Sequence, residues 1–136
     1  MKWAALIAWV ITAGGGFVLL SIWLTRGGMH QREGMRIRPP LIFTHFLLAA
    51  TGLVLWIVYL ADDKSTLAWI AFALLLVVAL LGFAMFALWL QQRQARTAPA
   101  DAAEQNFPVP IVVMHGLLAA TTLVLVFLTA VGVGGS

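Results

Sequence analysis

The chain contains no cysteine and little charge. Only 10% of its 136 residues are charged, whereas soluble domains average about 25%. The lack of cysteine excludes disulfide exchange, thiolate-ligated clusters and covalent haem attachment through a Cys-x-x-Cys-His motif. Any chemistry must therefore come from other side chains in a strongly apolar chain.

Acidic residues are also few, and all of them lie outside the long apolar runs. Zinc and di-metal sites in helical proteins usually need three or more ligands, often carboxylates. Proton-coupled transporters, including the small four-helix multidrug exporters, normally carry an acid inside a span. The sequence argues against both classes, and it contains no nucleophile–base arrangement that would support catalysis. The five acids are Glu33, Asp62, Asp63, Asp101 and Glu104.

Long apolar runs dominate the rest of the chain. Hydrophobic residues make up 62% of the sequence, and the mean hydropathy is +1.00. About 20 apolar residues cross the hydrocarbon core of a bilayer as a helix. We therefore expect one all-α transmembrane domain over 1–136, embedded in a lipid bilayer. We read the first run as a retained helix because it continues past signal-peptide length. The expected spans cover about 3–25, 41–61, 67–90 and 111–133.

The basic residues predict the orientation of these spans. Six arginines lie in the two loops after the first and third runs, whereas the opposite side holds only Lys2 and Lys64. Lysine and arginine are enriched in cytoplasmic loops. We therefore expect a multi-pass protein of the cell inner (plasma) membrane with both termini extracytoplasmic. The basic charge then reflects orientation and not a nucleic-acid partner.

Two segments of the chain are nearly identical. The eleven residues from His45 to Leu55 match those from His115 to Leu125 at nine positions, with an offset of 70. The first and third runs match more weakly at an offset of 66, as in Trp23 and Trp89. We therefore expect a four-helix bundle built from two tandem helical hairpins, about 3–61 and 67–133. Repeats of two spans run in the same direction through the membrane.

The repeated histidines are the candidate site. Ionisable side chains inside a span usually face the bundle interior and mark function. A pseudo-two-fold axis would place His45 and His115 opposite each other. Imidazole is the commonest metal ligand, and two axial imidazoles can hold a haem iron.

Small residues surround the expected position of this pair. On each histidine helix, the residues four and seven positions later share the histidine face, and glycines on the first and third spans lie at a similar depth. These small residues would leave room for a flat macrocycle, and two arginines at the cytoplasmic edge would pair with its propionates. The candidate residues are Ala49, Gly52, Ala119, Thr122, Gly16, Gly82, Arg36 and Arg38.

Because it combines a four-helix architecture with His45 and His115, the chain resembles the membrane-embedded b-type cytochromes. In these proteins a four-helix bundle holds haem between histidines of two helices. The resemblance implies haem b with both histidines as axial iron ligands, and electron transfer with a quinone or a redox-protein partner. Because the third histidine, His30, lies in a loop, one chain would hold at most one such haem.

Other interpretations stay open at this point. The small residues are also typical of close helix packing, which would suit a cofactor-free structural or assembly subunit of a larger membrane complex. The histidine pair would equally suit a proton-conducting or pH-gated membrane protein. Another tetrapyrrole would also suit the site, and the site would equally form between two chains of a homodimer.

Overall fold

The computed structural model describes residues 1–31, 33–96 and 99–134, and within these ranges it is helical with no strand. The helical elements of these ranges are four long helices and one short 3-10 helix. Each of the four expected spans falls largely within one long helix, and each of these helices is long and apolar enough to cross a membrane. The elements are α1 (Lys2–Thr25), α2 (Pro39–Asp62), α3 (Ser65–Ala95), η1 (Ala103–Asn106) and α4 (Val109–Ala130).

Local sequence explains where the helices begin and end. Prolines occupy the first turn of α2 and of α4, where a missing backbone N–H removes no helical hydrogen bond. Asp63 and Arg96, which follow α2 and α3, adopt left-handed backbone conformations with φ of 54° and 52°. A left-handed residue at this position commonly terminates a helix.

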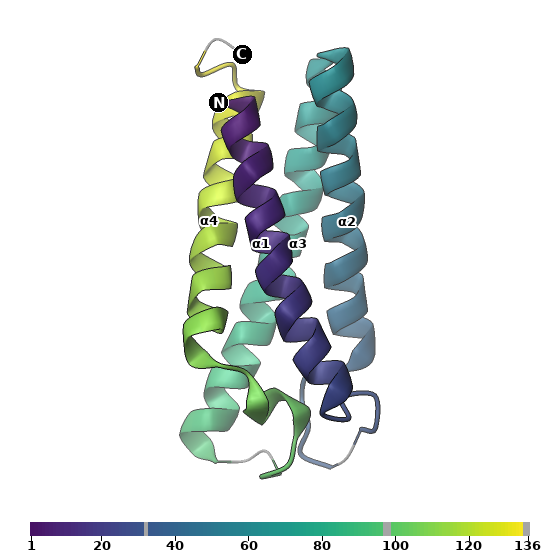
Figure 1. The fold of residues 1–136 in the computed structure, drawn as a ribbon, viewed down its shortest axis with the longest axis vertical. Helices are drawn as coiled ribbons and strands as arrows, with labels where there is room; N and C mark the ends of the chain where they lie inside the picture. The colour runs from purple at the N-terminus through teal and green to yellow at the C-terminus, as the bar shows by residue number, and fades with distance from the viewer. Residues whose placement is uncertain (32, 97–98, 135–136) are drawn as a thin grey trace.

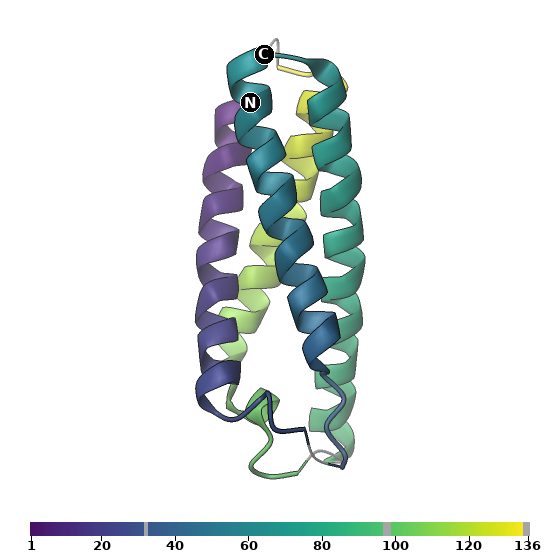
Figure 2. The same cartoon turned by 90° about the vertical axis from the view of Figure 1, so that its right-hand side faces the viewer.

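The four long helices form an elongated bundle. Figure 1 shows both termini at one end, which we call the terminal end. Figure 2 shows the two long connections at the opposite end, which we call the loop end. Helix α1 packs mainly along α4, and α2 packs mainly along α3. Consequently α2 and α4 face each other across the bundle, as do α1 and α3.

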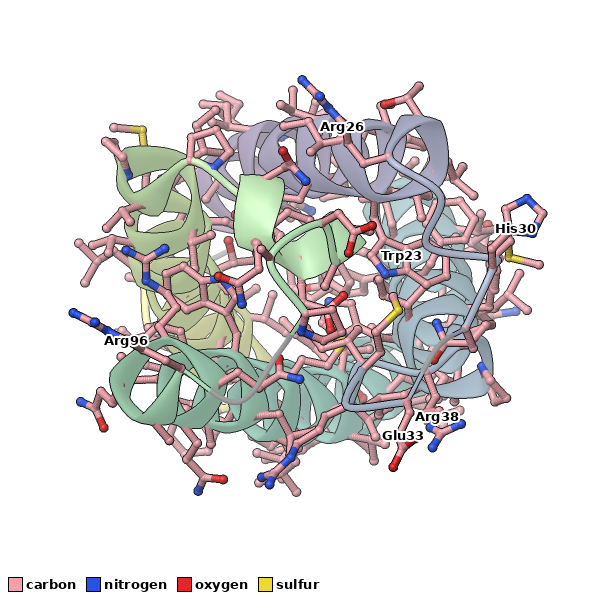
Figure 3. The ribbon with its side chains drawn as sticks, turned by 90° about the horizontal axis from the view of Figure 1, so that it is seen from below. Trp23, Arg26, His30, Glu33, Arg38 and Arg96 are labelled. Atoms are coloured by element: carbon pink, nitrogen blue, oxygen red, sulfur yellow. The ribbon has the colours of Figure 1, made fainter. Side chains whose placement is uncertain are left out.

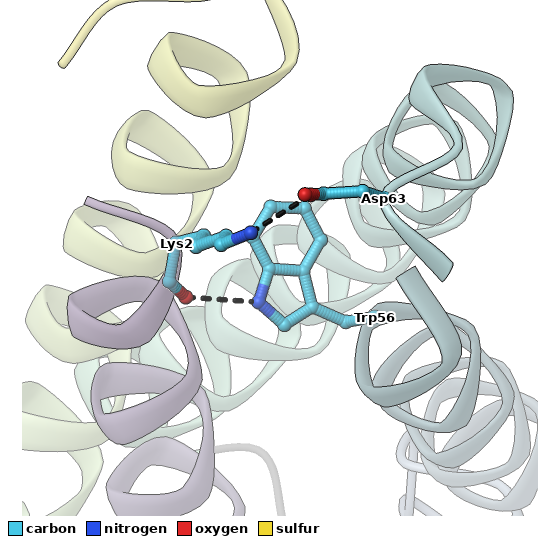
Figure 4. Close-up of polar contacts among 3 residues, drawn as sticks. All are labelled: Lys2, Trp56 and Asp63. Carbon is cyan, nitrogen blue, oxygen red and sulfur yellow. Dashed lines mark hydrogen bonds and ion pairs between the residues drawn. The ribbon is translucent and has the colours of Figure 1, made fainter. Parts of the chain in front are cut away.

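The terminal end is closely packed. Its core contains two tryptophans, Trp9 and Trp56, whose ring centroids lie 6.4 Å apart. The indole N–H of Trp56 donates to the backbone oxygen of Lys2 at 3.2 Å, and the Lys2 ammonium pairs with Asp63 at 2.7 Å (Figure 4). These contacts tie the start of α1 to the end of α2.

A second, smaller core lies at the loop end. It contains Trp23, Met35, Ala102 and Ala103, and we call this region the loop-end cap. About 16 Å of helix separates the two cores, at 1.5 Å per residue. Over this length every side chain is only half-buried or exposed. This intermediate level comprises residues 13–22, 39–51, 79–88 and 109–121.

Candidate functional site

The two repeated histidines meet in the intermediate level. His45 comes from α2 and His115 from α4, so their rings approach from opposite sides of the bundle. The ring centroids are 6.4 Å apart, and the ring planes are inclined by 65°. Residues separated by 70 positions in the sequence are thus brought to one point.

Each imidazole is oriented by a backbone carbonyl. Nδ1 of His45 donates to the oxygen of Val78 at 3.0 Å, and Nδ1 of His115 donates to the oxygen of Thr12 at 2.9 Å. A carbonyl oxygen only accepts, so Nδ1 carries the proton in each ring. In the neutral imidazole, Nε2 then keeps a free lone pair. Metal-binding histidines typically have this arrangement, because the second hydrogen bond fixes both tautomer and ring orientation.

Glycines permit the close approach of both rings. A Cβ atom built on Gly16 would lie 3.1 Å from Cε1 of His115, and one built on Gly82 would lie 3.1 Å from Cε1 of His45. Gly16 and Gly82 are related by the offset of 66, as are Thr12 and Val78. The carbonyl partner and the neighbouring glycine of each histidine therefore occupy equivalent positions in the two repeats.

The other small residues near the histidines contact protein side chains. A Cβ atom on Gly52 would lie 3.0 Å from the Trp9 ring, and the Thr122 hydroxyl lies 3.1 Å from that of Thr12. Ala49 packs against the terminal-end core, and Ala119 is half-buried on α4. Gly52 and Thr122 thus belong to the edge of the terminal-end core.

Both candidate arginines are exposed at the loop end. Arg36 donates to Oε1 of Gln91 at 3.4 Å, and Figure 3 shows Arg38 at the rim of the bundle. Neither side chain is packed inside the bundle beside the histidine pair. Their pairing with propionates stays a prediction.

A groove runs beside His115 on the outside of the bundle. It lies between α1 and α4, has a volume of about 300 Å³, and is lined by Gly15, Val18, Met114 and other apolar residues. Among the described residues, no three His, Cys, Asp or Glu side chains come together as a metal-binding group. The histidine pair alone supplies two ligands. A metal held there would need further donor atoms from a bound ligand.

The structure also reveals buried polar groups that the sequence analysis did not single out. Glu104 and Gln92 are 0% exposed at the loop end. Sequence reasoning missed them because both lie in a polar, alanine-rich stretch typical of a solvated connection. The one available signal was the pair of small residues Ala102 and Ala103 directly before Glu104, which allows η1 to approach the bundle closely.

Comparison with known proteins gives no independent assignment. No protein-family model matches the chain, and neither the curated proteins nor the solved structures contain a match.

Proposed function

We propose that the protein is an integral membrane protein that binds one haem b between His45 and His115 and transfers electrons. The observation that carries the proposal is the pair of imidazoles facing each other across the bundle, each with Nδ1 bonded to a carbonyl. The haem supplies a one-electron redox centre when it is bound. The chain supplies the ligands, their orientation and an apolar surrounding.

The separation of the rings suits a shared metal atom. Metal–imidazole bonds are about 2.0–2.1 Å long, so two imidazoles on opposite sides of one metal have ring centroids about 6 Å apart. The observed separation is 6.4 Å. His45 and His115 would therefore be able to hold one metal atom between them, and a tetrapyrrole would supply the remaining donor atoms.

Packing around the pair also supports a bound macrocycle. Interiors of helix bundles are normally close-packed, yet no side chain of the intermediate level is fully buried. Gly16 on α1 and Gly82 on α3 lie at this level, and each lies against a histidine ring without a side chain of its own. A flat ligand lying between α1 and α3 would complete the interior at this level.

The distribution of charge supports the membrane orientation. Arg26, Arg36, Arg38, Arg93 and Arg96 all lie at the loop end, whereas Lys2 and Lys64 lie at the terminal end with Asp62 and Asp63. By the positive-inside rule, this distribution supports a loop end in the cytoplasm and both termini outside. Electrons would reach the haem through a partner protein or a lipid-soluble carrier.

A cofactor-free structural subunit is the second candidate. It is favoured by Gly52, whose open side is occupied by Trp9, and by the Thr12–Thr122 contact. These small residues contribute to helix packing whether or not a cofactor is bound. The two functions therefore differ in one observable property, which is the presence of haem.

A reduced-minus-oxidised visible spectrum of the purified protein tests the proposal. After expression in haem-replete cells, we expect a sharp low-spin b-type signal and about one haem per chain. Replacement of the exposed loop histidine, His30→Ala, is the matched control and should leave the signal unchanged. A protein that purifies colourless from such cells would overturn the haem proposal and favour the structural subunit.

A further inference from the structure

The loop-end cap contains an unusual set of buried oxygen atoms. Both carboxylate oxygens of Glu104 and the amide oxygens of Gln92 and Gln31 are buried without a hydrogen-bond partner. Glu104 and Gln92 are 0% exposed. Buried polar groups are nearly always hydrogen-bonded, so four unpaired oxygens at one end of the bundle indicate a missing positive or donating partner.

The two amide groups are held with their oxygens free. The side-chain nitrogen of Gln92 donates to the backbone oxygen of Gly34 at 3.1 Å, and that of Gln31 donates to the oxygen of Gly28 at 2.6 Å. Rotating either amide by half a turn would direct an oxygen at a carbonyl oxygen, which only accepts. The groups left over are therefore acceptors.

Contacts through two tryptophans bring these groups to the same region. The indole N–H of Trp89 donates to the backbone oxygen of Glu104 at 3.1 Å. Gln92 lies three residues after Trp89 and so on the same face of α3. On the other side, Trp23 of α1 belongs to the same hydrophobic cluster as Ala103, the neighbour of Glu104, and α1 contacts η1. The Trp23 indole is the one unpaired buried side-chain donor among the described residues.

The carboxylate of Glu104 has no basic partner among the side chains that the structure describes. Seen from the loop end in Figure 3, Arg26, Arg38 and Arg96 lie around the rim, whereas Trp23 lies toward the centre. Burying a carboxylate without a partner is strongly unfavourable.

We propose that the loop-end cap binds a small hard metal cation through the Glu104 carboxylate and the Gln92 amide oxygen. Hard cations such as Ca²⁺ and Na⁺ prefer carboxylate, amide and carbonyl oxygens, with waters completing the shell. The Trp23 indole N–H would donate to a carboxylate oxygen or to such a water. Because one carboxylate supplies all the charge, the site should be weak, with a dissociation constant of about 10⁻⁴–10⁻³ M for Ca²⁺. This site does not depend on the haem proposal.

Terbium luminescence tests the cation site directly. Tb³⁺ replaces Ca²⁺ at oxygen sites, and its emission is sensitised by nearby tryptophans such as Trp23 and Trp89. With the full-length protein in zwitterionic nanodiscs, we expect emission that saturates at about one Tb³⁺ per chain and is displaced by Ca²⁺ or Na⁺. The cation that displaces it at the lower concentration identifies the preferred class.

Two variants test whether Tb³⁺ binds at the loop-end cap or at an exposed acid elsewhere on the surface. We expect Glu104→Gln to weaken Tb³⁺ binding at least tenfold, while Glu33→Gln, which removes an exposed acid in the other long loop, leaves it unchanged. If Glu104→Gln does not fold, Glu104→Asp and the displacement of Tb³⁺ from the unaltered protein by Ca²⁺ or Na⁺ still test the cation site. Emission that does not saturate, or equal binding by wild type and a folded Glu104 variant, would overturn the proposal.

Discussion

The surroundings of His45 and His115 are alike on the inside of the bundle and different on its outside. Inside, each Nδ1 donates to the carbonyl of an equivalent residue, at 3.0 Å and 2.9 Å. Each ring also lies against a glycine at an equivalent position. A Cβ atom built on either glycine would lie 3.1 Å from Cε1 of the ring. The groups that orient the two Nε2 atoms are therefore the same in both halves.

The outward-facing side of each histidine differs between the two halves. Gly15 lies beside His115 and lines the groove between α1 and α4, whereas the equivalent residue on α3 is Leu81. Phe46 follows His45 and packs edge-on against Phe17 at 5.4 Å, whereas the residue after His115 is Gly116. These differences leave both Nδ1 hydrogen bonds in place.

This contrast favours a role for the histidines as a pair. Packing alone would be served by any small or apolar residue at each position, and the packing residues on the outer side of the histidines differ between the halves, as in Gly15 and Leu81. The backbone carbonyl that fixes the tautomer and the glycine beside the ring are retained in both halves, although the carbonyl belongs to Thr12 in one half and to Val78 in the other. This comparison supports the proposal that His45 and His115 bind one ligand together.

The largest predicted effect comes from closing the space beside each ring. In Gly16→Leu and Gly82→Leu, the new side chain would displace the histidine that lies 3.1 Å from the added Cβ. Overpacking of this kind lowers the free energy of unfolding by about 3 kcal/mol at the upper end of its usual range. Unfolding in detergent would measure the loss, and the haem signal should disappear from both variants. Gly14→Leu is the control, because its Cβ meets nothing within 4 Å.

The second prediction replaces a residue of the first repeat with its equivalent from the second repeat, on the terminal-end side of the histidines. Gly52 and Thr122 are equivalent positions, but Gly52 is closely covered by the Trp9 ring. Gly52→Thr should therefore lower the free energy of unfolding by about 1–3 kcal/mol through overpacking. Pairing it with Trp9→Leu, which copies the equivalent Leu75, should restore part of the loss. An unchanged stability in the single variant would show that Trp9 does not occupy this space.

A smaller effect is expected at the polar contact between α1 and α4. Thr12→Val removes the hydroxyl that lies 3.1 Å from the Thr122 hydroxyl and copies the equivalent Val78. The loss should be about 0.5–1.5 kcal/mol, the net value of one hydrogen bond. Because His115 bonds the backbone oxygen of Thr12, the visible spectrum should not change. A shifted spectrum would mean that the hydroxyl itself acts on the histidine.

The smallest effect is expected in the groove beside His115. Gly15→Leu copies Leu81, and its Cβ would meet His115 at an ordinary contact distance of 3.5 Å. We expect a gain of about 0.5–1 kcal/mol from improved helix propensity and filled space. Comparing the thermal unfolding of Gly15→Leu with that of Gly14→Leu would separate the contribution of helix propensity from that of the filled space. A clear loss of stability would show that the groove must stay open for His115 to keep its position.

Sequence reasoning predicted the parts of this protein that depend on local pattern. The four helices follow from the length of the apolar runs, and the meeting of His45 with His115 follows from the repeat. The carbonyl partners of these histidines could not be predicted, because a backbone oxygen has no residue type. The contact of Trp9 with Gly52 and the burial of Glu104 depend on how distant segments pack, which a single sequence does not specify.

The most direct test of the central claim compares His45→Ala with His115→Ala. Haem content and the EPR spin state of both variants would be measured beside wild type and His30→Ala. The account predicts one low-spin haem per chain in wild type and in His30→Ala, and an equal loss or conversion to high spin in both site variants. A wild-type low-spin signal retained by either site variant would contradict it.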